Sequence, residues 1–271
     1  MMNWNQLISA KRFGMEEFHE ERQENRSEFQ RDYDRLIFSA PFRRLQNKTQ
    51  VFPLPGSVFV HNRLTHSLEV ASVGRSLGDD VAKALLERHP ELQDSFLPEI
   101  GSIVSAACLA HDLGNPPFGH SGEKAISTFF SEGKGVRLKE KQPNGEQLSP
   151  MEWEDLIHFE GNANAFRILT HQFEGRRKGG FVLTYTTLAS IVKYPFSSSL
   201  AGTKSKFGFF VSEEESFRKI ATELGLILLN EHPLKYARHP LVYLVEAADD
   251  ICYQMMDIED AYKLKILTTE E

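Results

Sequence analysis

Apolar residues recur every three or four positions over long stretches of this chain, and this spacing predicts a mainly helical protein. The longest such stretch spans residues 64–88, and a second apolar run begins at Ile100 and stops before Gly114. Further helices are predicted over residues 24–35, 122–130, 161–169, 183–193, 213–229 and 240–263. Because helices dominate and no internal repeat divides them, we predict an all-α fold built as a helical bundle.

Proline and glycine mark where these helices end. Pro90 and Pro195 each follow a helical pattern that they cannot continue. Residues 52–57 contain both residue types, which predicts a loop or a short β-hairpin near residues 51–60. Residues 131–151 carry turn residues without periodicity and are predicted to form a loop.

The segment 34–51 combines basic residues with apolar positions. One interpretation is an amphipathic helix with a solvated charged face, and the other is one wall of an anion pocket. The pattern alone leaves both interpretations open. The basic residues are Arg35, Arg43, Arg44 and Lys48.

Composition narrows the class of protein. The chain has 271 residues, of which 41% are hydrophobic, so it is long enough to bury one sizeable core. Within it, residues 1–35 are predicted to form a polar N-terminal arm and a helix, and residues 36–271 the main domain. The formal net charge of −7 argues against a surface built for long polyanions and favours small anionic substrates.

Two cysteines, Cys108 and Cys252, lie in apolar helical patterns and cannot form a disulfide framework. No secretory signal and no apolar run of membrane-spanning length is found. We therefore expect a cytoplasmic protein with no membrane partner.

The most specific chemistry lies where the apolar helix from Ile100 ends. His111 and Asp112 are adjacent there, just before Gly114 stops the helix, so both side chains can bind one ion at its end. Two ligands leave such an ion half coordinated. His66 and Asp249 are the candidates for the remaining ligands.

His120 and Glu123 are three residues apart at the start of a predicted helix. This spacing lets the carboxylate orient the imidazole, which is the usual arrangement of a general acid or base. A capping carboxylate beside a surface histidine is the alternative interpretation.

The last helix carries Asp249, Tyr253 and Asp257 at intervals of four, so these three side chains share one face. An exposed helix would more naturally pair its acids with lysines. Acid, aromatic and acid in a row on an otherwise apolar helix favour a ligand pocket.

These residues carry a resemblance to a known family. His66, the His111–Asp112 pair and Asp249 resemble, in that order, the H…HD…D pattern of the HD-domain superfamily, whose fold is all-helical. More narrowly, several segments are similar to the deoxynucleoside triphosphate triphosphohydrolases, the dGTPase-like family. These segments are residues 41–45, 48–51, 62–67, 111–123, 160–163 and 246–253. The resemblance implies hydrolysis of a dNTP to a deoxynucleoside and inorganic triphosphate, by attack at the α-phosphorus.

The resemblance also implies roles for individual residues. A site of two imidazoles and two carboxylates suits an octahedral divalent cation, Mn²⁺ or Mg²⁺ and also Fe²⁺, Co²⁺ or Ni²⁺, better than a closed zinc site. His120 would protonate the leaving 5′-oxygen or handle the attacking water, with Glu123 fixing its orientation. Residues similar to those that contact the substrate are Gln50, Arg63, Asn162, Lys193, Tyr194, Tyr253 and Asp257. Among these, Arg63, Lys193 and Tyr194 would meet the triphosphate, Gln50 and Tyr253 the sugar, and Asp257 the 3′-hydroxyl.

Members of this family normally continue well beyond the helix that ends near Lys263, with helices that contact the base and neighbouring subunits. We therefore expect a metal-dependent phosphohydrolase domain over residues 36–271 that lacks those C-terminal helices. Besides the dNTP substrate, a homo-oligomer and single-stranded DNA stay open as partners.

Two alternatives stay open at this point. One is another HD phosphohydrolase, a 5′-nucleotidase or a phosphodiesterase, which would release orthophosphate from a monophosphate. The other is a non-catalytic nucleotide sensor or single-strand nucleic-acid binder. Release of inorganic triphosphate from a dNTP would distinguish the leading hypothesis from both.

Overall fold

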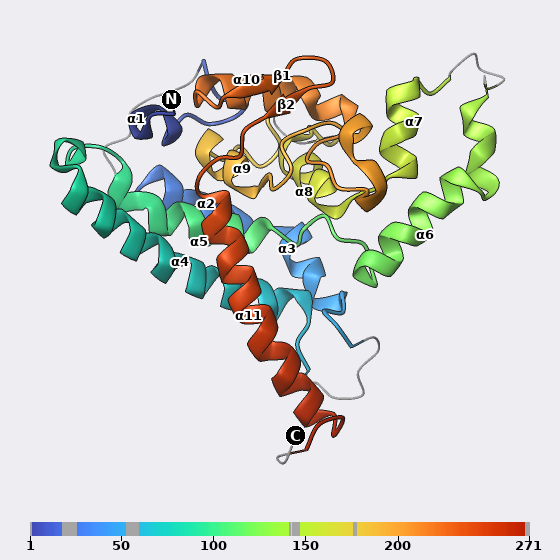
Figure 1. Cartoon of the computed structure of the whole chain (residues 1–271), viewed down its shortest axis with the longest axis horizontal. Helices are drawn as coiled ribbons and strands as arrows, with labels where there is room; N and C mark the ends of the chain where they lie inside the picture. The colour runs from blue at the N-terminus through green and yellow to red at the C-terminus, as the bar shows by residue number, and fades with distance from the viewer. Residues whose placement is uncertain are drawn as a thin grey trace.

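The computed structural model describes residues 2–17, 26–52, 60–140, 142, 147–175 and 178–268. Across these residues the chain is mainly helical, with one two-stranded antiparallel sheet (Figure 1). The predicted all-α helical bundle is therefore confirmed. The predicted loop or hairpin near residues 51–60 falls largely on residues 53–59, which lie outside the described residues.

The α-helices in chain order are α1 (Trp4–Leu7), α2 (Glu28–Ile37), α3 (Ala40–Arg44), α4 (Arg63–Arg88), α5 (Ile100–Ala110), α6 (Gly119–Ser131), α7 (Pro150–Ile157), α8 (Gly161–Thr170), α9 (Tyr185–Ile191), α10 (Glu214–Glu223) and α11 (Val242–Lys263). Strand β1 (Leu228–Asn230) pairs with β2 (Lys235–Tyr236). Short 3₁₀ turns lie at Leu45–Asn47, Pro90–Leu92, Leu97–Glu99, Lys134–Lys139, Ser198–Leu200, Gly202–Lys204 and Val211–Glu213.

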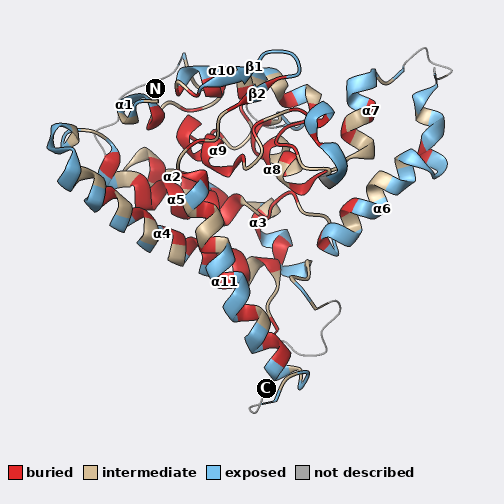
Figure 2. Cartoon of the chain, viewed as in Figure 1, coloured by how far each residue is buried: buried red, intermediate tan, exposed pale blue. Residues whose placement is uncertain are grey.

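Helix α5 forms the centre of the core. All eleven of its residues are buried, as its almost wholly apolar sequence requires (Figure 2). Helix α4 packs against it through glycine: a Cβ atom on Gly78 would lie 2.7 Å from the Cα atom of Gly101. Helices α2, α9 and α11 also pack on α5. The C-terminal end of α5, where His111 follows, is thereby fixed by packing from several sides.

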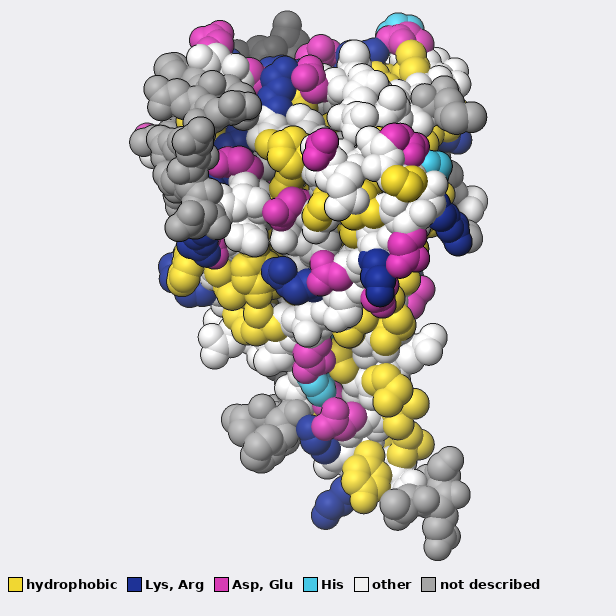
Figure 3. All heavy atoms as spheres, turned by 90° about the vertical axis from the view of Figure 1, so that its left-hand side faces the viewer, with side chains coloured by type: hydrophobic (Ala, Val, Ile, Leu, Met, Phe, Trp, Pro, Cys, Tyr) yellow, Lys and Arg dark blue, Asp and Glu magenta, His cyan; other side chains and the backbone are white. Residues whose placement is uncertain are grey.

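Helix α11 crosses α4 and projects from the body of the protein (Figure 1). Its inner face is buried through Val245, Ala248 and Cys252. Its outer face exposes an apolar stripe, and hydrophobic side chains follow the projecting part in Figure 3. The stripe consists of Ile251, Met255, Ile258 and Tyr262.

Two segments are less helical than their patterns allowed: 34–51, for which one amphipathic helix was one of two interpretations, and the helix predicted over 213–229. The segment 34–51 is not one amphipathic helix, because α2 ends at Ile37 and the Ser39 side chain caps the new helix α3. The helix predicted over 213–229 ends at Glu223, because Gly225 turns the chain with a φ of +65° before β1 begins.

Helix α7 was not predicted, because its segment contains only two turns and follows a loop rich in turn residues. The chain starts it with a capping box between Ser149 and Glu152 and with Pro150 in the first turn.

Helix α4 begins with a reciprocal cap. The Asn62 side chain accepts hydrogen bonds from the backbone N–H groups of Leu64 and Thr65, each at 3.0 Å, and Thr65 Oγ1 accepts one from the Asn62 N–H at 3.2 Å. This cap fixes the first turn of α4, which carries Arg63 and His66.

Asn62→Ala is expected to lower the free energy of unfolding by about 1 kcal/mol, because two backbone N–H groups lose their acceptor. Urea unfolding followed by circular dichroism measures this. Asn47→Ala is the matched control, since Asn47 is exposed in a 3₁₀ turn and makes no cap. Equal midpoints for the two variants would contradict the role of the cap.

Candidate active site

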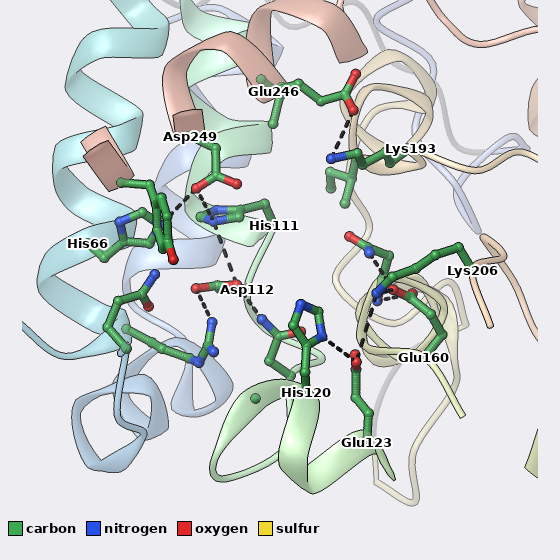
Figure 4. A pocket seen from close by; sticks show the side chains of 18 of the residues that line it. His66, His111, Asp112, His120, Glu123, Glu160, Lys193, Lys206, Glu246 and Asp249 are labelled. Atoms are coloured by element: carbon green, nitrogen blue, oxygen red, sulfur yellow. Dashed lines mark hydrogen bonds and ion pairs between the residues drawn. The ribbon is translucent and has the colours of Figure 1, made fainter. Parts of the chain in front are cut away.

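One cavity of about 490 Å³ collects nearly all the residues that the sequence singled out (Figure 4). Its walls come from the segment before α4, the first turn of α4, the end of α5, the start of α6 and the N-terminal half of α11. The start of α8, the end of α9 with the residues that follow it, and Lys206 complete them. Of the thirteen residues singled out, twelve line this cavity: Gln50, Arg63, His66, His111, Asp112, His120, Glu123, Asn162, Lys193, Tyr194, Asp249 and Tyr253. Asp257 does not line it.

Three side chains form a compact group of ligand atoms at one end of the cavity. One atom each from His66, His111 and Asp112 lies within 4.8 Å of the others. Asp249 adjoins this group, with Oδ1 2.9 Å from His66 Nε2 and 3.6 Å from His111 Nε2. Three separate helical segments thus bring two imidazoles and two carboxylates to one point.

His111 has a nitrogen that lacks a hydrogen-bond partner among the described residues. Its Nδ1–H donates to the Cys108 carbonyl at 2.6 Å, and its buried Nε2 is left without a hydrogen bond. Because the Cys108 carbonyl holds Nδ1, Nε2 is the nitrogen that faces the other ligand atoms, as in a metal-binding histidine whose second nitrogen is fixed by a carbonyl. The residues present therefore fit a divalent cation.

The electrostatics of this group fit a cation as well. Burial lowers the pKa of His111, but Asp112 and Asp249 raise it further, to about 9. Burial raises the pKa of Asp249, but the His111 and His66 imidazoles hold it well below its ordinary value. Without a metal the group thus holds a proton in place of a cation, and a metal ion would displace that proton.

Asp112 is held in place by two neighbours. Its Oδ2 accepts a hydrogen bond from Arg63 Nη1 at 2.7 Å, and its Oδ1 accepts one from the Asn115 side-chain amide. Burial raises its pKa, but His111 and Arg63 lower it more, so the carboxyl is ionised at neutral pH. The carboxylate is therefore oriented toward the cluster before any ligand binds.

Acidic residues outnumber basic ones around the cavity. Among the described residues that line it, the carboxylates are Asp112, Glu123, Glu160, Glu246 and Asp249, and the basic residues are Arg63, Lys193 and Lys206. A polyphosphate would be repelled by five carboxylates facing three basic groups, and a divalent cation would offset the excess of two negative charges.

A second group lies across the cavity from the cluster. His120 Nδ1 is 2.7 Å from Glu123 Oε2, and Glu123 Oε1 accepts from the Gly161 N–H at 2.8 Å. A Cβ atom on Gly161 would lie 2.9 Å from Glu123 Oε1, so glycine permits this close approach. The Glu123 side chain is 12% exposed, whereas that of His120 is 85% exposed. Glu123 thus holds Nδ1 of the His120 ring, and Nε2 is left to contact a ligand.

Two lysines face the cavity with their charges partly paired. Lys193 Nζ lies 2.9 Å from Glu246, and Lys206 Nζ lies 2.8 Å from Glu160 and 3.8 Å from Glu123 (Figure 4). Burial lowers the pKa of each lysine, but the paired glutamate raises it further. Both lysines therefore stay protonated and present positive charge to an anion.

The remaining wall carries Gln50 and Tyr253. Gln50 Oε1 is buried without a hydrogen-bond partner among the described residues, so it is free to accept from a ligand. The Tyr253 hydroxyl bonds to the Asp257 carboxyl, whose pKa is raised by burial. Asp257 thus adjoins the cavity through Tyr253.

The sequence analysis assigns no role to Lys206, and it includes Glu160 and Glu246 only as members of the family-like segments 160–163 and 246–253, although all three line the cavity. Lys206 lies in a loop without periodicity, where a lone basic residue is no signal. Glu160 directly precedes α8 and caps it, which a sequence indicates only as a helix start.

The comparisons with known proteins agree with this geometry. The profile of the HD domain matches residues 63–177. A "Deoxyguanosinetriphosphate triphosphohydrolase-like protein" of Synechocystis sp. is 45% identical over 275 residues, which cover 98% of this chain and 61% of the relative. A protein of the same name from Pseudomonas aeruginosa is 46% identical over 278 residues, covering 100% and 59%.

A "Deoxyguanosinetriphosphate triphosphohydrolase" of Yersinia enterocolitica is 36% identical over 304 residues, covering 100% of this chain and 57% of the relative. The chain thus spans about three fifths of the length of these curated relatives. Within the described part of the chain, every helix is too short or too polar to cross a lipid bilayer. The chain carries an HD domain and belongs with the deoxyguanosinetriphosphate triphosphohydrolase-like proteins.

Proposed function

We propose that this chain is the catalytic part of a metal-dependent hydrolase that converts a dNTP, with dGTP as the first candidate, to the deoxynucleoside and inorganic triphosphate. The observation that carries the proposal is the shared cavity, in which the His66, His111 and Asp112 cluster faces the His120–Glu123 pair. The names of the relatives support the same substrate class. We place this HD phosphohydrolase domain at residues 36–271, with residues 1–35 as an N-terminal arm and helix.

His66, His111, Asp112 and Asp249 would hold the divalent cation, for which Mn²⁺ and Mg²⁺ are the first candidates. A bound cation of this kind polarises a phosphoryl oxygen and offsets the negative charge of the phosphates. Arg63 positions Asp112 through the hydrogen bond at 2.7 Å.

His120 is the proposed general acid. With Nδ1–H bonded to Glu123, the protonated ring presents Nε2–H to the cavity and can donate it to the 5′-oxygen that leaves the α-phosphorus. The Glu123 carboxylate stabilises the charged ring and sets its orientation, and Gly161 and Lys206 in turn hold Glu123.

The other wall residues would bind the rest of the substrate. Arg63, Lys193 and Tyr194 are proposed to meet the phosphates together with Lys206, and Asn162 lines the same cavity. Gln50 and Tyr253 are proposed to contact the sugar, with Asp257 accepting from the 3′-hydroxyl. A homo-oligomer and single-stranded DNA remain further proposals for the whole protein.

The direct test is product analysis by ³¹P NMR. With dGTP and Mn²⁺ or Mg²⁺, we expect equimolar deoxyguanosine and inorganic triphosphate, because the scissile bond joins the 5′-oxygen and the α-phosphorus. Removal of the metal with EDTA is expected to abolish turnover, and added Mn²⁺ to restore it. Orthophosphate released from dGTP, or faster hydrolysis of dGMP than of dGTP, would contradict the proposal.

A further inference from the structure

The residue directly before α6, Phe118, has a backbone conformation that is unusual for its type. Its φ of +66° and ψ of +19° lie in the left-handed region, which a bulky side chain rarely adopts. It also occupies the N-cap position of α6, where Ser, Thr, Asp or Asn would accept a backbone hydrogen bond, and its side chain makes no such bond. Of the four non-glycine residues with positive φ in the described part of the chain, Phe118 alone lines the active-site cavity. Local stability therefore does not explain a phenylalanine at this position.

The neighbouring residues maintain this turn. The Phe118 carbonyl accepts a hydrogen bond from the Ser121 N–H at 3.1 Å. Gly119 follows with a φ of +52°, and a Cβ atom there would lie 2.7 Å from Arg63 Nη2. The turn thus packs closely against the first turn of α4, and it places Phe118 and His120, two residues apart, in the lining of one cavity.

The Phe118 ring is accessible and has no aromatic or cationic partner. Phe118 is 51% exposed, and within the described part of the chain its ring forms neither an aromatic pair nor a cation–π contact. Two tyrosines also line the cavity, and both have polar partners. Lys193 Nζ lies 5.8 Å from the centroid of the Tyr194 ring, and the Tyr253 hydroxyl bonds to Asp257. Phe118 thus offers the cavity a purely apolar ring.

A nucleotide bound as proposed above still needs a partner for its base. The metal cluster and the basic residues account for the phosphates, and Gln50 and Tyr253 for the sugar. Only the sugar separates the 5′-oxygen from the base, so a ring two residues from the proposed general acid His120 is within reach of the base. Aromatic side chains bind bases by stacking, and each such contact strengthens binding by about tenfold.

We propose that the Phe118 ring stacks on the base of the nucleotide in the active-site cavity and contributes affinity without selecting the base. The inference rests on the proposed function, because the role of His120 at the 5′-oxygen sets where the base lies. Every base has a flat aromatic face, so stacking alone does not distinguish guanine from adenine. The unfavourable backbone conformation is kept because it holds the ring in the cavity wall.

Steady-state kinetics test this role. Phe118→Asn removes the ring but introduces a residue type that adopts the left-handed region, so the turn and His120 are expected to stay in place. We expect KM for dGTP to rise about tenfold with kcat nearly unchanged, because stacking contributes equally to the ground state and the transition state. Phe118→Tyr keeps a flat ring and is expected to keep the parent KM.

Phe96→Asn is the matched control. Phe96 is also 51% exposed and also precedes a helical turn, but it lies outside the cavity. Its substitution is expected to leave KM and kcat at the parent values, and circular dichroism checks the fold of each variant.

Tryptophan emission tests the contact without hydrolysis. Deoxyguanosine is uncharged, so the carboxylates of the cavity do not repel it and no metal is needed. In Phe118→Trp it is expected to quench the added emission in a saturable way, and deoxyadenosine is expected to do so with a similar dissociation constant. Free 2-deoxyribose, which has no base, and deoxyguanosine with Phe96→Trp are expected to cause no saturable change.

Several results would overturn the stacking role. These are an unchanged KM in Phe118→Asn, the absence of saturable quenching in Phe118→Trp, or quenching by 2-deoxyribose equal to that by deoxyguanosine. A fall in kcat with an unchanged KM would assign Phe118 to holding His120 instead. Failure of the parent protein to release inorganic triphosphate would contradict the proposed function, whereas the emission experiment would still decide whether Phe118 binds a base.

Discussion

Asp112→Ala is expected to abolish binding of the divalent cation and to lower turnover of dGTP at least about a thousandfold, while the helical fold persists. Asp112 contributes one of the three mutually close ligand atoms, and its carboxylate is already oriented by Arg63 and Asn115. Two imidazoles and the adjoining Asp249 cannot replace it, because the remaining group offers fewer charged ligands to the ion.

The same substitution affects stability. Removal of the carboxylate leaves the Arg63 guanidinium, whose side chain is 9% exposed, without its ion-pair partner, so we expect a loss of about 3 kcal/mol. Asp112→Asn keeps the volume and one acceptor, so it is expected to fold better than the alanine variant and still to lose the metal. Asp80→Ala removes an exposed carboxylate from α4 and serves as the control.

Isothermal titration calorimetry measures the affinity for Mn²⁺, ³¹P NMR measures the rate of dGTP turnover, and circular dichroism measures the helical content. An Asp112→Asn protein that binds Mn²⁺ and hydrolyses dGTP as well as the parent would end the metal-dependent mechanism. A folded protein that loses both properties would support it.

Much of the fold followed from local patterns. The start of α4 could be predicted from Asn62 and Thr65, because a cap is encoded within four residues. The end of α5 could be predicted because Gly114 and the prolines after it stop a helix. The break between α2 and α3 and the β1–β2 hairpin were missed, since both are short and depend on tertiary contacts that no sequence window contains.

The site residues likewise divide into those that the sequence indicates and those that only the structure places. His111 and Asp112 are adjacent in sequence and follow an almost wholly apolar helix, which makes them conspicuous. Lys206 and Glu160 are 46 residues apart, with α8 and α9 between them, and meet only in the folded chain, at 2.8 Å. Their pairing, and their contact with Glu123, depends on how α6, α8 and that loop pack, so only the structure places them.

His120→Gln is expected to lower kcat for dGTP about 10²–10³-fold and to leave Mn²⁺ affinity and the free energy of unfolding nearly unchanged. The His120 side chain is 85% exposed and forms a hydrogen bond to Glu123, so it contributes little to packing. Glutamine keeps a donor toward Glu123 but cannot carry a proton to the leaving oxygen.

His89→Gln is the matched control, because His89 also pairs with a glutamate near it in sequence, Glu91, at 3.1 Å, but lies outside the cavity.

A substrate whose leaving group needs no proton distinguishes the two roles open to His120, which are protonation of the leaving oxygen and activation of the attacking water. With p-nitrophenyl triphosphate in place of dGTP, the variant is expected to recover most of its rate if His120 protonates the leaving oxygen. An equal loss of rate on both substrates would instead assign His120 to the attacking water. Activation of the water precedes departure of the leaving group, so its rate does not depend on the basicity of the leaving oxygen.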